Sequence, residues 1–331
     1  MKPSYSFVIP FLNEEATLVE LFDRIAAATR PLLPPGGTFE LIFVDDGSTD
    51  GSARVAEQLA NEHPEVSLVQ LRGNFGKSAA LAAGFERAAG DIVFTLDADL
   101  QDDPKEIPRF LEKLDEGYDV VSGYKEKRHD PWHKVFPSRI FNGMVRKLTG
   151  IQLRDVNCGF KAYRSDVIKS VRLYGEMHRF VPVLAHWRRF RVGEIVVEHH
   201  ARRFGVSKFG TGRFYRGFMD LLTVFFLLKY DRKPLHFFGL PGALCTLAGL
   251  AICALLTVEW LLGASIGTRP LLSLGVLLTV VGVQILATGL IAELVVHLGS
   301  RQETPYEIRR VIEGVSASAA VPLPAAREGA A

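Results

Sequence analysis

Two long apolar stretches in the C-terminal third place the strongest constraint on how this chain can fold. Residues 237–262 and 271–298 are almost wholly apolar, and each exceeds the roughly 20 residues that a helix needs to cross a bilayer. The connector 263–270 is too short to form a domain. We therefore predict a transmembrane helical hairpin; a buried hairpin in a soluble protein is the alternative.

Basic residues flank this predicted hairpin on both sides, whereas the connector has only Arg269. The flanking residues are Lys229, Arg232, Lys233, Arg301, Arg309 and Arg310. The positive-inside bias then predicts that both flanks are cytoplasmic and that the connector faces out. We divide the chain into a cytosolic domain (1–230), the hairpin (231–300) and a cytosolic tail (301–331), which is rich in Ala, Ser and Pro and is expected to be disordered after about residue 314.

Strand-like and helix-like segments alternate over the first 122 residues. The predicted strands are 6–9, 39–44, 66–71, 92–96 and 119–122, and the predicted helices are 16–28, a helix ending near 62, and 78–89. Alternation at this spacing indicates βαβ units and a mostly parallel sheet with helices on both faces. The fold class is therefore predicted to be α/β.

Polar residues follow the first four predicted strands. They are Asn13, Glu14, Asp45, Asp46, Asn74, Lys77, Asp97 and Asp99. The carboxyl ends of parallel strands lie along one edge of the sheet, where open α/β sheets bind their ligands. We expect the functional site at this edge.

Asp97 and Asp99 form the sharpest feature of that edge, because they follow the apolar strand 92–96 directly. On an extended backbone, residues two apart point the same way. Two carboxylates so placed repel each other unless a cation lies between them, and Mg²⁺ or Mn²⁺ takes such oxygens together with substrate phosphates. The pattern predicts a metal–diphosphate site; turn-forming aspartates at a strand end, before Asp103-Pro104, are the alternative.

Segments at about 134–149 and 213–230 combine basic residues with apolar residues at helical spacing. Such helices suit an anionic membrane surface. A core-packing helix with a basic solvent face is the alternative. The downstream hairpin favours the first interpretation, in which these helices bring the cytosolic domain down onto the lipid.

Other features exclude competing classes of protein. The net charge of +2 gives no reason to expect a nucleic-acid partner, and the three scattered cysteines lack metal-ligand spacing. No G-x-G-x-x-G follows the first strand, which disfavours a dinucleotide-dependent oxidoreductase.

Six motifs, in order along the chain, resemble family 2 glycosyltransferases of the polyisoprenyl-phosphate type. This group contains dolichyl-phosphate mannose synthases and bacterial undecaprenyl-phosphate glycosyltransferases. The motifs are Val8–Pro10 with Asn13–Glu15, Val44–Asp50, Asn74–Lys77, Leu96–Asp102, Asn157–Lys161 and Arg203–Phe209. Each is weak alone, but all six followed by a hairpin are specific, and the resemblance spans about residues 5–310.

The resemblance implies a GT-A fold and inverting transfer of a sugar from a UDP- or GDP-linked donor to a polyprenyl phosphate such as undecaprenyl phosphate. It also implies a divalent metal, Mg²⁺ or Mn²⁺, and a location in the bacterial inner membrane with the catalytic domain in the cytoplasm. Related proteins can be homo-oligomers. The nature of the sugar stays open.

Site residues follow from the same resemblance, position by position. The nucleotide set is Pro10, Asn13, Glu14, Asp45, Asp46, Asn74, Lys77 and Asp97; the metal set is Asp99 and Gln101; the catalytic set is Asp97, Asp99 and Asp155. Family members usually have Arg directly before the Asn of the third motif, where this chain has Gly73 after Arg72.

Three further assignments keep an alternative. Asp155 is expected near the reacting centre, or else as a capping or turn residue. Arg202, Arg203 and Lys208 are expected to grip the acceptor phosphate or close over the donor, or else to form a solvated loop. His178 and Arg179 are expected to line the sugar pocket, although a lone histidine is more often structural.

Two rival functions remain. A glycan-chain synthase of the same family usually has more membrane spans and a Q-x-x-R-W motif, which this sequence lacks. A non-catalytic membrane scaffold would bind nucleotide or lipid without turnover.

Overall fold

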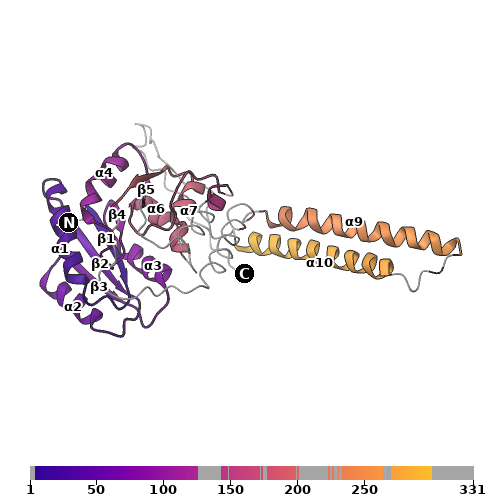
Figure 1. Cartoon of the computed structure of the whole chain (residues 1–331), viewed down its shortest axis with the longest axis horizontal. Helices are drawn as coiled ribbons and strands as arrows, with labels where there is room; N and C mark the ends of the chain where they lie inside the picture. Colours follow the sequence, from indigo (N-terminus) through magenta and orange to yellow (C-terminus); the bar gives the residue numbers. More distant parts are fainter. Residues whose placement is uncertain are drawn as a thin grey trace, which may run out of the picture.

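The computed structural model describes residues 4–125, 143–147, 149–171, 173, 177–198, 200, 223, 226, 230, 233–263, 265 and 270–299. The chain forms an α/β domain from which a hairpin of two long helices projects (Figure 1).

A seven-stranded sheet forms the centre of the domain, in the order β3-β2-β1-β4-β6-β5-β7. The strands are β1 (Tyr5–Phe11), β2 (Phe39–Asp45), β3 (Val66–Gln70), β4 (Ile92–Thr95), β5 (Val120–Tyr124), β6 (Lys161–Arg164) and β7 (Val192–Val196). Strand β6 runs antiparallel to both of its neighbours, β4 and β5, and the other paired strands are parallel. The predicted mostly parallel α/β sheet is confirmed; β6 and β7 were not among the predicted strands.

Helices cover both faces of this sheet. They are α1 (Leu18–Thr29), α2 (Ser52–Glu62), α3 (Lys77–Arg87), α4 (Ile107–Asp115), α6 (Ser165–Ser170) and α7 (Val181–Trp187), with the 3₁₀ turns η1 (Arg30–Leu32), η2 (Pro104–Glu106) and η3 (Met177–Phe180). Alternate β1 residues point to opposite faces: Phe7 packs with α1 and α4, whereas Val8 packs with α3. Burying a side chain of this size stabilises the fold by about 1.5–3 kcal/mol, so β1 joins both layers of the core.

Strand register brings the loops that follow β1, β2 and β4 together. Phe11 pairs with Asp45, and Val8 pairs with both Ile42 and Thr95. All three strands are parallel and end at the same edge, as the strand-end pattern predicts. The site is built there.

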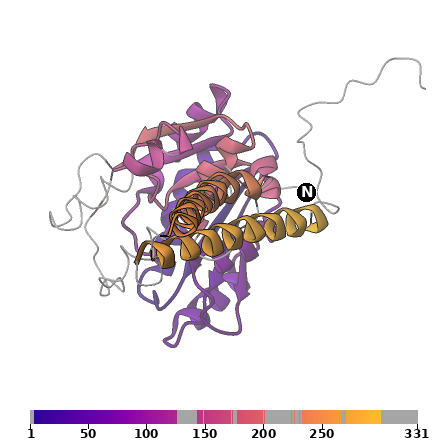
Figure 2. The same ribbon diagram turned by 90° about the vertical axis from the view of Figure 1, so that its right-hand side faces the viewer.

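The hairpin consists of α9 (Pro234–Leu261) and α10 (Pro270–Gly299), which lie side by side in both views (Figures 1 and 2). Both are long and apolar enough to span a membrane. Their ends lie within three residues of the predicted bounds. Their outer faces are exposed in this chain, with Leu244 and Leu290 each 59% accessible. Domain packing therefore does not cover them, which disfavours the buried-hairpin alternative.

Small residues allow the two hairpin helices to approach closely. A Cβ added at Gly249 would lie 2.6 Å from the Gly275 carbonyl oxygen, and one at Gly242 would lie 3.0 Å from that of Gly282. At the domain end, Glu293 accepts a hydrogen bond from the Leu235 amide at 3.2 Å, which satisfies one of the free N–H groups at the start of α9.

Much of the two predicted amphipathic segments lies outside the described residues. Within the first, 143–147 and 149 are helical, and Val145 is fully buried in a cluster with Ile151 and Phe180. This part packs against the domain core, as the alternative interpretation expected. Of the second segment only residues 223, 226 and 230 are described, and the tail 301–331 is outside the described residues.

Candidate active site

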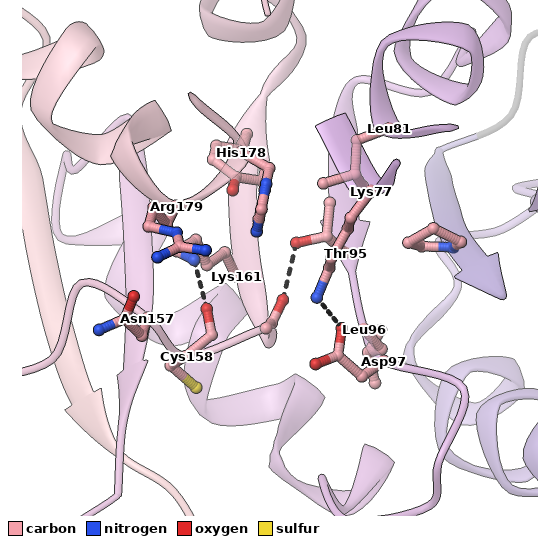
Figure 3. Close-up of a pocket in the computed structure, with 13 residues that line it drawn as sticks. Lys77, Leu81, Thr95, Leu96, Asp97, Asn157, Cys158, Lys161, His178 and Arg179 are labelled. Carbon is pink, nitrogen blue, oxygen red and sulfur yellow. Dashed lines mark hydrogen bonds and ion pairs between the residues drawn. The ribbon is translucent and has the colours of Figure 1, made fainter. Parts of the chain in front are cut away.

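A cavity of about 100 Å³ lies at the carboxyl end of β4 (Figure 3). Its walls come from β4, the first turn of α3, the segment before β6, and η3. The polar or titratable side chains that line it are Lys77, Thr95, Asp97, Asn157, Cys158, Lys161, Tyr163, His178 and Arg179. Elements more than 100 residues apart in sequence thus share one small, charged space.

Asp97 and Lys77 form an ion pair on one side of this cavity. About a third of the Asp97 side chain is exposed, at 34%. Burial raises the pKa of Asp97, but the charges of Lys77, and further away Lys125 and Lys161, outweigh that effect and lower the pKa to about 2. Asp97 is therefore a carboxylate at neutral pH.

The Asp97 carboxylate needs a glycine opposite it. A Cβ added at Gly159 would lie 2.5 Å from Asp97 Oδ2, and the Thr95 hydroxyl donates to the Gly159 carbonyl at 2.9 Å. The segment before β6 is thereby held directly against the end of β4.

Asp99 departs from the predicted geometry. Strand β4 ends at Thr95, residues 98 and 99 form a turn, and Leu100 has φ of +58°. The extended backbone assumed for the aspartate pair is therefore wrong: Asp97 lines the cavity, whereas Asp99 does not and accepts from the Gln101 amide at 3.3 Å. The turn interpretation thus holds for the local backbone of Asp99.

The predicted metal residues lie beside the segment that follows β7. The Gln101 side-chain amide donates to the His200 carbonyl at 3.3 Å, and the His200 amide donates to the Gln101 carbonyl at 2.9 Å. Among the described residues, no group of three or more His, Cys, Asp or Glu side chains is arranged to hold a metal. Asp99 and Gln101 do supply hard oxygen donors of the kind that Mg²⁺ or Mn²⁺ takes together with substrate phosphates and water, so they fit such an ion.

Two buried cations occupy the opposite side of the cavity. Lys161, on β6, is 4% exposed and donates to the Cys158 carbonyl, and Arg179, on η3, is 9% exposed. Burial, together with repulsion from Lys77, lowers the pKa of Lys161 to about 8, although Cys158 acts in the opposite direction. Sequence reasoning missed Lys161; the available signal was a lysine between the apolar residues Phe160 and Ala162.

His178 connects η3 to the start of α3. Its Nδ1 lies 2.9 Å from the Ser78 hydroxyl, which also accepts from the His178 backbone amide at 3.0 Å. Burial and the neighbouring charges of Lys77, Arg179 and Lys161 lower the pKa of His178 to about 2. The ring is therefore neutral at pH 7, and it both lines the cavity and has a structural bond.

The loops after β1 and β2 are bonded to each other. Asn13, with φ of +52°, donates its amide to the Ser48 hydroxyl at 3.0 Å and accepts from the Thr49 amide at 2.7 Å. The Glu14 amide donates to the Ser52 hydroxyl at 2.8 Å. Pro10 lines the cavity from the end of β1. These contacts hold the predicted nucleotide-contact loops in a defined shape.

Asp45 and Asp46 are adjacent in sequence, but their carboxylates bond to different parts of the fold. Asp45 is fully buried and accepts from the Ser48 amide at 2.8 Å and the Gln70 side chain at 3.3 Å. The Asp45 carboxylate therefore faces β3, and its nucleotide contact stays a prediction. Asp46, 6% exposed, accepts from the amides of Phe75 and Gly76 at 2.8 and 3.0 Å; burial raises its pKa in spite of these bonds.

A layer of buried charges lies behind the cavity. Asp102 and Lys125 form an ion pair at 3.0 Å, with 1% and 16% of their side chains exposed. Asp155 is 2% exposed, does not line the cavity, and accepts from the Asn157 amide at 3.1 Å, which is the turn role that the sequence left open. Burial raises the pKa of Cys158 to about 12, so its thiol is not a nucleophile at neutral pH.

Residues 6–172 match the family model for glycosyl transferase family 2. The chain belongs to this family. It is also 39% identical to a dodecaprenyl-phosphate galacturonate synthase from Rhizobium johnstonii, over 94% of both chains. An undecaprenyl-phosphate 4-deoxy-4-formamido-L-arabinose transferase from Pseudomonas paraeruginosa is 37% identical, over 98% of this chain and 94% of that protein.

The solved structures most relevant here share the fold of this glycosyltransferase. Glucosyl-3-phosphoglycerate synthase from Mycobacterium tuberculosis, in complex with phosphoglyceric acid, superposes with a TM-score of 0.53 and 23% identity, over 67% of this chain and 79% of that one. The same enzyme in complex with Mn²⁺ and UDP-glucose gives a TM-score of 0.51 and 22% identity, over 67% and 79% of the two chains. The GT-A prediction is confirmed.

Other predicted site residues of this glycosyltransferase lie at the surface or beyond the described part. Asn74 and Arg72 are exposed on the loop between β3 and α3, so Arg72 is near the place of the family arginine but extends into solvent. Arg202, Arg203 and Lys208 are outside the described residues.

Proposed function

We propose that this glycosyltransferase moves a sugar from a nucleotide-sugar donor to a polyprenyl phosphate at the cytoplasmic face of the bacterial inner membrane. The observation that carries the proposal is the ionised Asp97 beside Lys77 at the carboxyl edge of a family 2 domain whose chain continues into an apolar helical hairpin. The names of the Rhizobium and Pseudomonas relatives support a polyprenyl-phosphate acceptor. The flanking basic residues support the orientation.

The acceptor chemistry suits this set of residues. A phosphate monoester carries about −1.5 to −2 charges at pH 7, so its oxygen attacks the anomeric carbon without a strong protein base. The new carbon–oxygen bond forms as the bond to the donor diphosphate breaks, and its electron pair leaves with the nucleoside diphosphate. One displacement inverts the anomeric centre.

The protein's main task is to stabilise negative charge on the departing diphosphate. A divalent ion held by Asp99 and Gln101 would supply Lewis-acid stabilisation there. Lys77, at the start of α3, adds a positive charge at the same edge, and Asp97 holds its ammonium in place. Pro10, Asn13, Glu14, Asp46 and Asn74 border the same edge, where we place the nucleoside, and Arg202, Arg203 and Lys208 remain our candidates for the acceptor phosphate.

Purified full-length protein in lipid nanodiscs tests this proposal with a panel of radiolabelled UDP- and GDP-sugars and undecaprenyl phosphate. We expect one lipid-linked monosaccharide, formed with Mg²⁺ or Mn²⁺ and abolished by EDTA. Asp99→Asn should lower the rate at least 100-fold, whereas Arg54→Met, at a side chain that is 81% exposed, should leave it unchanged.

The outcomes separate the rival functions. Folded wild-type protein that yields no lipid-linked sugar from any donor refutes the proposal. A long glycan product identifies a chain synthase, and donor binding without turnover identifies a scaffold.

A further inference from the structure

Gln284 places a side-chain amide in the middle of an otherwise apolar helix. It lies about midway between Pro270, where α10 begins, and Gly299, where α10 ends. At 1.5 Å per residue this helix is about 45 Å long, whereas the hydrocarbon core of a bilayer is about 30 Å thick. Wherever a core of that thickness lies along the helix, a residue at the middle of the helix is inside it.

This amide faces away from the other helix of the hairpin. Gly275, Gly282 and Gly289 mark the side of α10 that contacts α9, because a Cβ added at any of them would meet an α9 side chain. Gln284 comes two residues after Gly282, and a helix turns about 100° per residue, so Gln284 points to nearly the opposite side. Its side chain is exposed there.

No group in the described part of the chain satisfies the Gln284 side chain. The backbone carbonyl of Gln284 accepts from the Thr288 hydroxyl at 2.9 Å, but the side-chain amide makes no hydrogen bond to any described residue. In water such an amide is satisfied by the solvent. In hydrocarbon it has no such partner, and an unpaired polar group is unfavourable. A membrane-spanning α10 therefore needs a partner for Gln284 from outside the hairpin.

The surface around Gln284 suits a neighbouring helix. Ala287 and Thr288, one turn further along, are short and are exposed on the same side. Val280 and Ile291 extend this face in both directions and are 49% and 63% accessible. Small residues allow two helix backbones to approach closely in a membrane, and a polar side chain between them then forms an interhelical hydrogen bond.

We propose that α10 packs against α10 of a second copy of this chain, with the two Gln284 side chains hydrogen-bonded to each other. A side-chain amide carries both a donor and an acceptor, so it is complementary to another amide. A second copy inserts in the same orientation and therefore presents its amide at the same depth. In a two-fold symmetric pair each amide both donates and accepts.

Other occupants of this face lack that match. Lipid tails and the prenyl chain of an acceptor are hydrocarbon, and they provide no hydrogen-bonding group at the depth of Gln284. A different membrane protein would need a polar side chain at this same depth. A second copy of the chain has one because its sequence is the same.

Self-association of the full-length protein in liposomes tests the inference. Energy transfer between chains labelled at the N-terminus, measured over a range of protein-to-lipid ratios, gives the association constant. We expect the wild type to associate and Gln284→Leu to weaken association about 5- to 30-fold, the effect of one interhelical amide bond in model helices. Gln284→Asn keeps an amide and should retain part of the affinity. Leu290→Ala changes an exposed side chain on another side of α10 and should alter the affinity less than twofold.

Cross-linking locates the interface. Thr288→Cys places a thiol on the face of Gln284, and mild oxidation in the bilayer should link two chains through it. Leu290→Cys, two residues further along, points to nearly the opposite side and should stay reduced. Peptide mass spectrometry distinguishes these disulfides from any that involve the native Cys245 and Cys253.

Several results would overturn the inference. One is a wild-type protein that stays monomeric at every protein-to-lipid ratio, and another is association that Gln284→Leu leaves unchanged. Linkage through Leu290→Cys without linkage through Thr288→Cys places the interface on a different side of α10. A monomer that co-purifies with a different membrane protein assigns the face to that partner. Because leucine is favourable in a membrane-spanning helix, we expect Gln284→Leu to fold, and the wild-type and cross-linking measurements do not depend on it.

Discussion

Lys161→Met should make the protein more stable, because it removes a charge that is buried beside the cavity. Lys161 is 4% exposed, and burial lowers its pKa from 10.5 to about 8. At about 1.4 kcal/mol per pKa unit, the protonated side chain destabilises the folded state by about 3 kcal/mol. This figure already includes the attraction of nearby carboxylates, because those interactions are part of the pKa.

The substitution also has an unfavourable effect. Lys161 donates to the buried Cys158 carbonyl, and leaving that carbonyl without its partner costs about 1–3 kcal/mol. The net change at pH 7 is a stabilisation of about 0–2 kcal/mol, or an apparent Tm higher by up to roughly 6 °C. Differential scanning fluorimetry of the full-length protein in detergent, supported by urea unfolding, measures it.

The pH dependence gives the sharper test. The folded-state pKa of Lys161 is below its unfolded value, so between pH 8 and about 10.5 the unfolded chain binds more protons and the stability contributed by this group rises with pH. The advantage of Lys161→Met should therefore shrink between pH 7.5 and pH 9.5. Lys169→Met, an exposed lysine on α6, should change stability by less than about 0.5 kcal/mol throughout. A variant that is several degrees less stable at pH 7, or a difference that does not change with pH, would refute this reasoning.

Three further predictions concern other parts of the fold. The pKa of Asp97 is lowered to about 2, so its ion pair contributes stability above about pH 4 that is lost as the pH falls towards 2. Urea unfolding at pH 5 and pH 3 should show a loss about 0.5 kcal/mol larger in wild type than in Asp97→Asn; the full linkage value of about 1 kcal/mol is halved for partial solvent exposure. Gly47→Ala places a Cβ on a backbone with φ of +78°, 2.5 Å from the Gly73 carbonyl carbon. This substitution should lower the free energy of unfolding by about 1–3 kcal/mol and weaken nucleotide binding. An unchanged Tm and an unchanged affinity for UDP would contradict this prediction. Gly275→Cys places its Cβ 3.0 Å from the Cys253 sulfur, so mild oxidation should form a disulfide that links α9 to α10. Peptide mass spectrometry that finds only free thiols would argue against this hairpin packing.

Much of the architecture could be predicted because it depends on local pattern. Strand and helix periodicity, the polar residues at strand ends and the length of two apolar runs are all visible within windows of 5–30 residues. These features were enough to predict the α/β class, the edge that holds Asp97, and the hairpin. The motifs in their order were enough to indicate the family.

Neighbouring aspartates in the same motif have positions that local sequence pattern does not determine. Asp45 and Asp46 have the same chemistry in one motif, yet β3 covers the first and the loop after β3 holds the second. Asp97 and Asp99 were expected to point together, but β4 ends at Thr95 and a turn separates them. Such differences of one residue depend on strand pairing and strand length, which local propensity does not determine.

The sequence by itself determined which kinds of side chain stand at the ends of the strands and that a membrane-spanning hairpin follows. Only the tertiary structure decided that Lys77, Lys161 and Arg179 share one cavity. Antiparallel insertion of β6 between β4 and β5 brings Lys161 beside the end of β4, and the Ser78–His178 bonds bring η3 there as well. The physical reason is that charges so distant in sequence meet only when the whole sheet has paired, and the resulting burial gives Lys161 a pKa that no isolated segment would have.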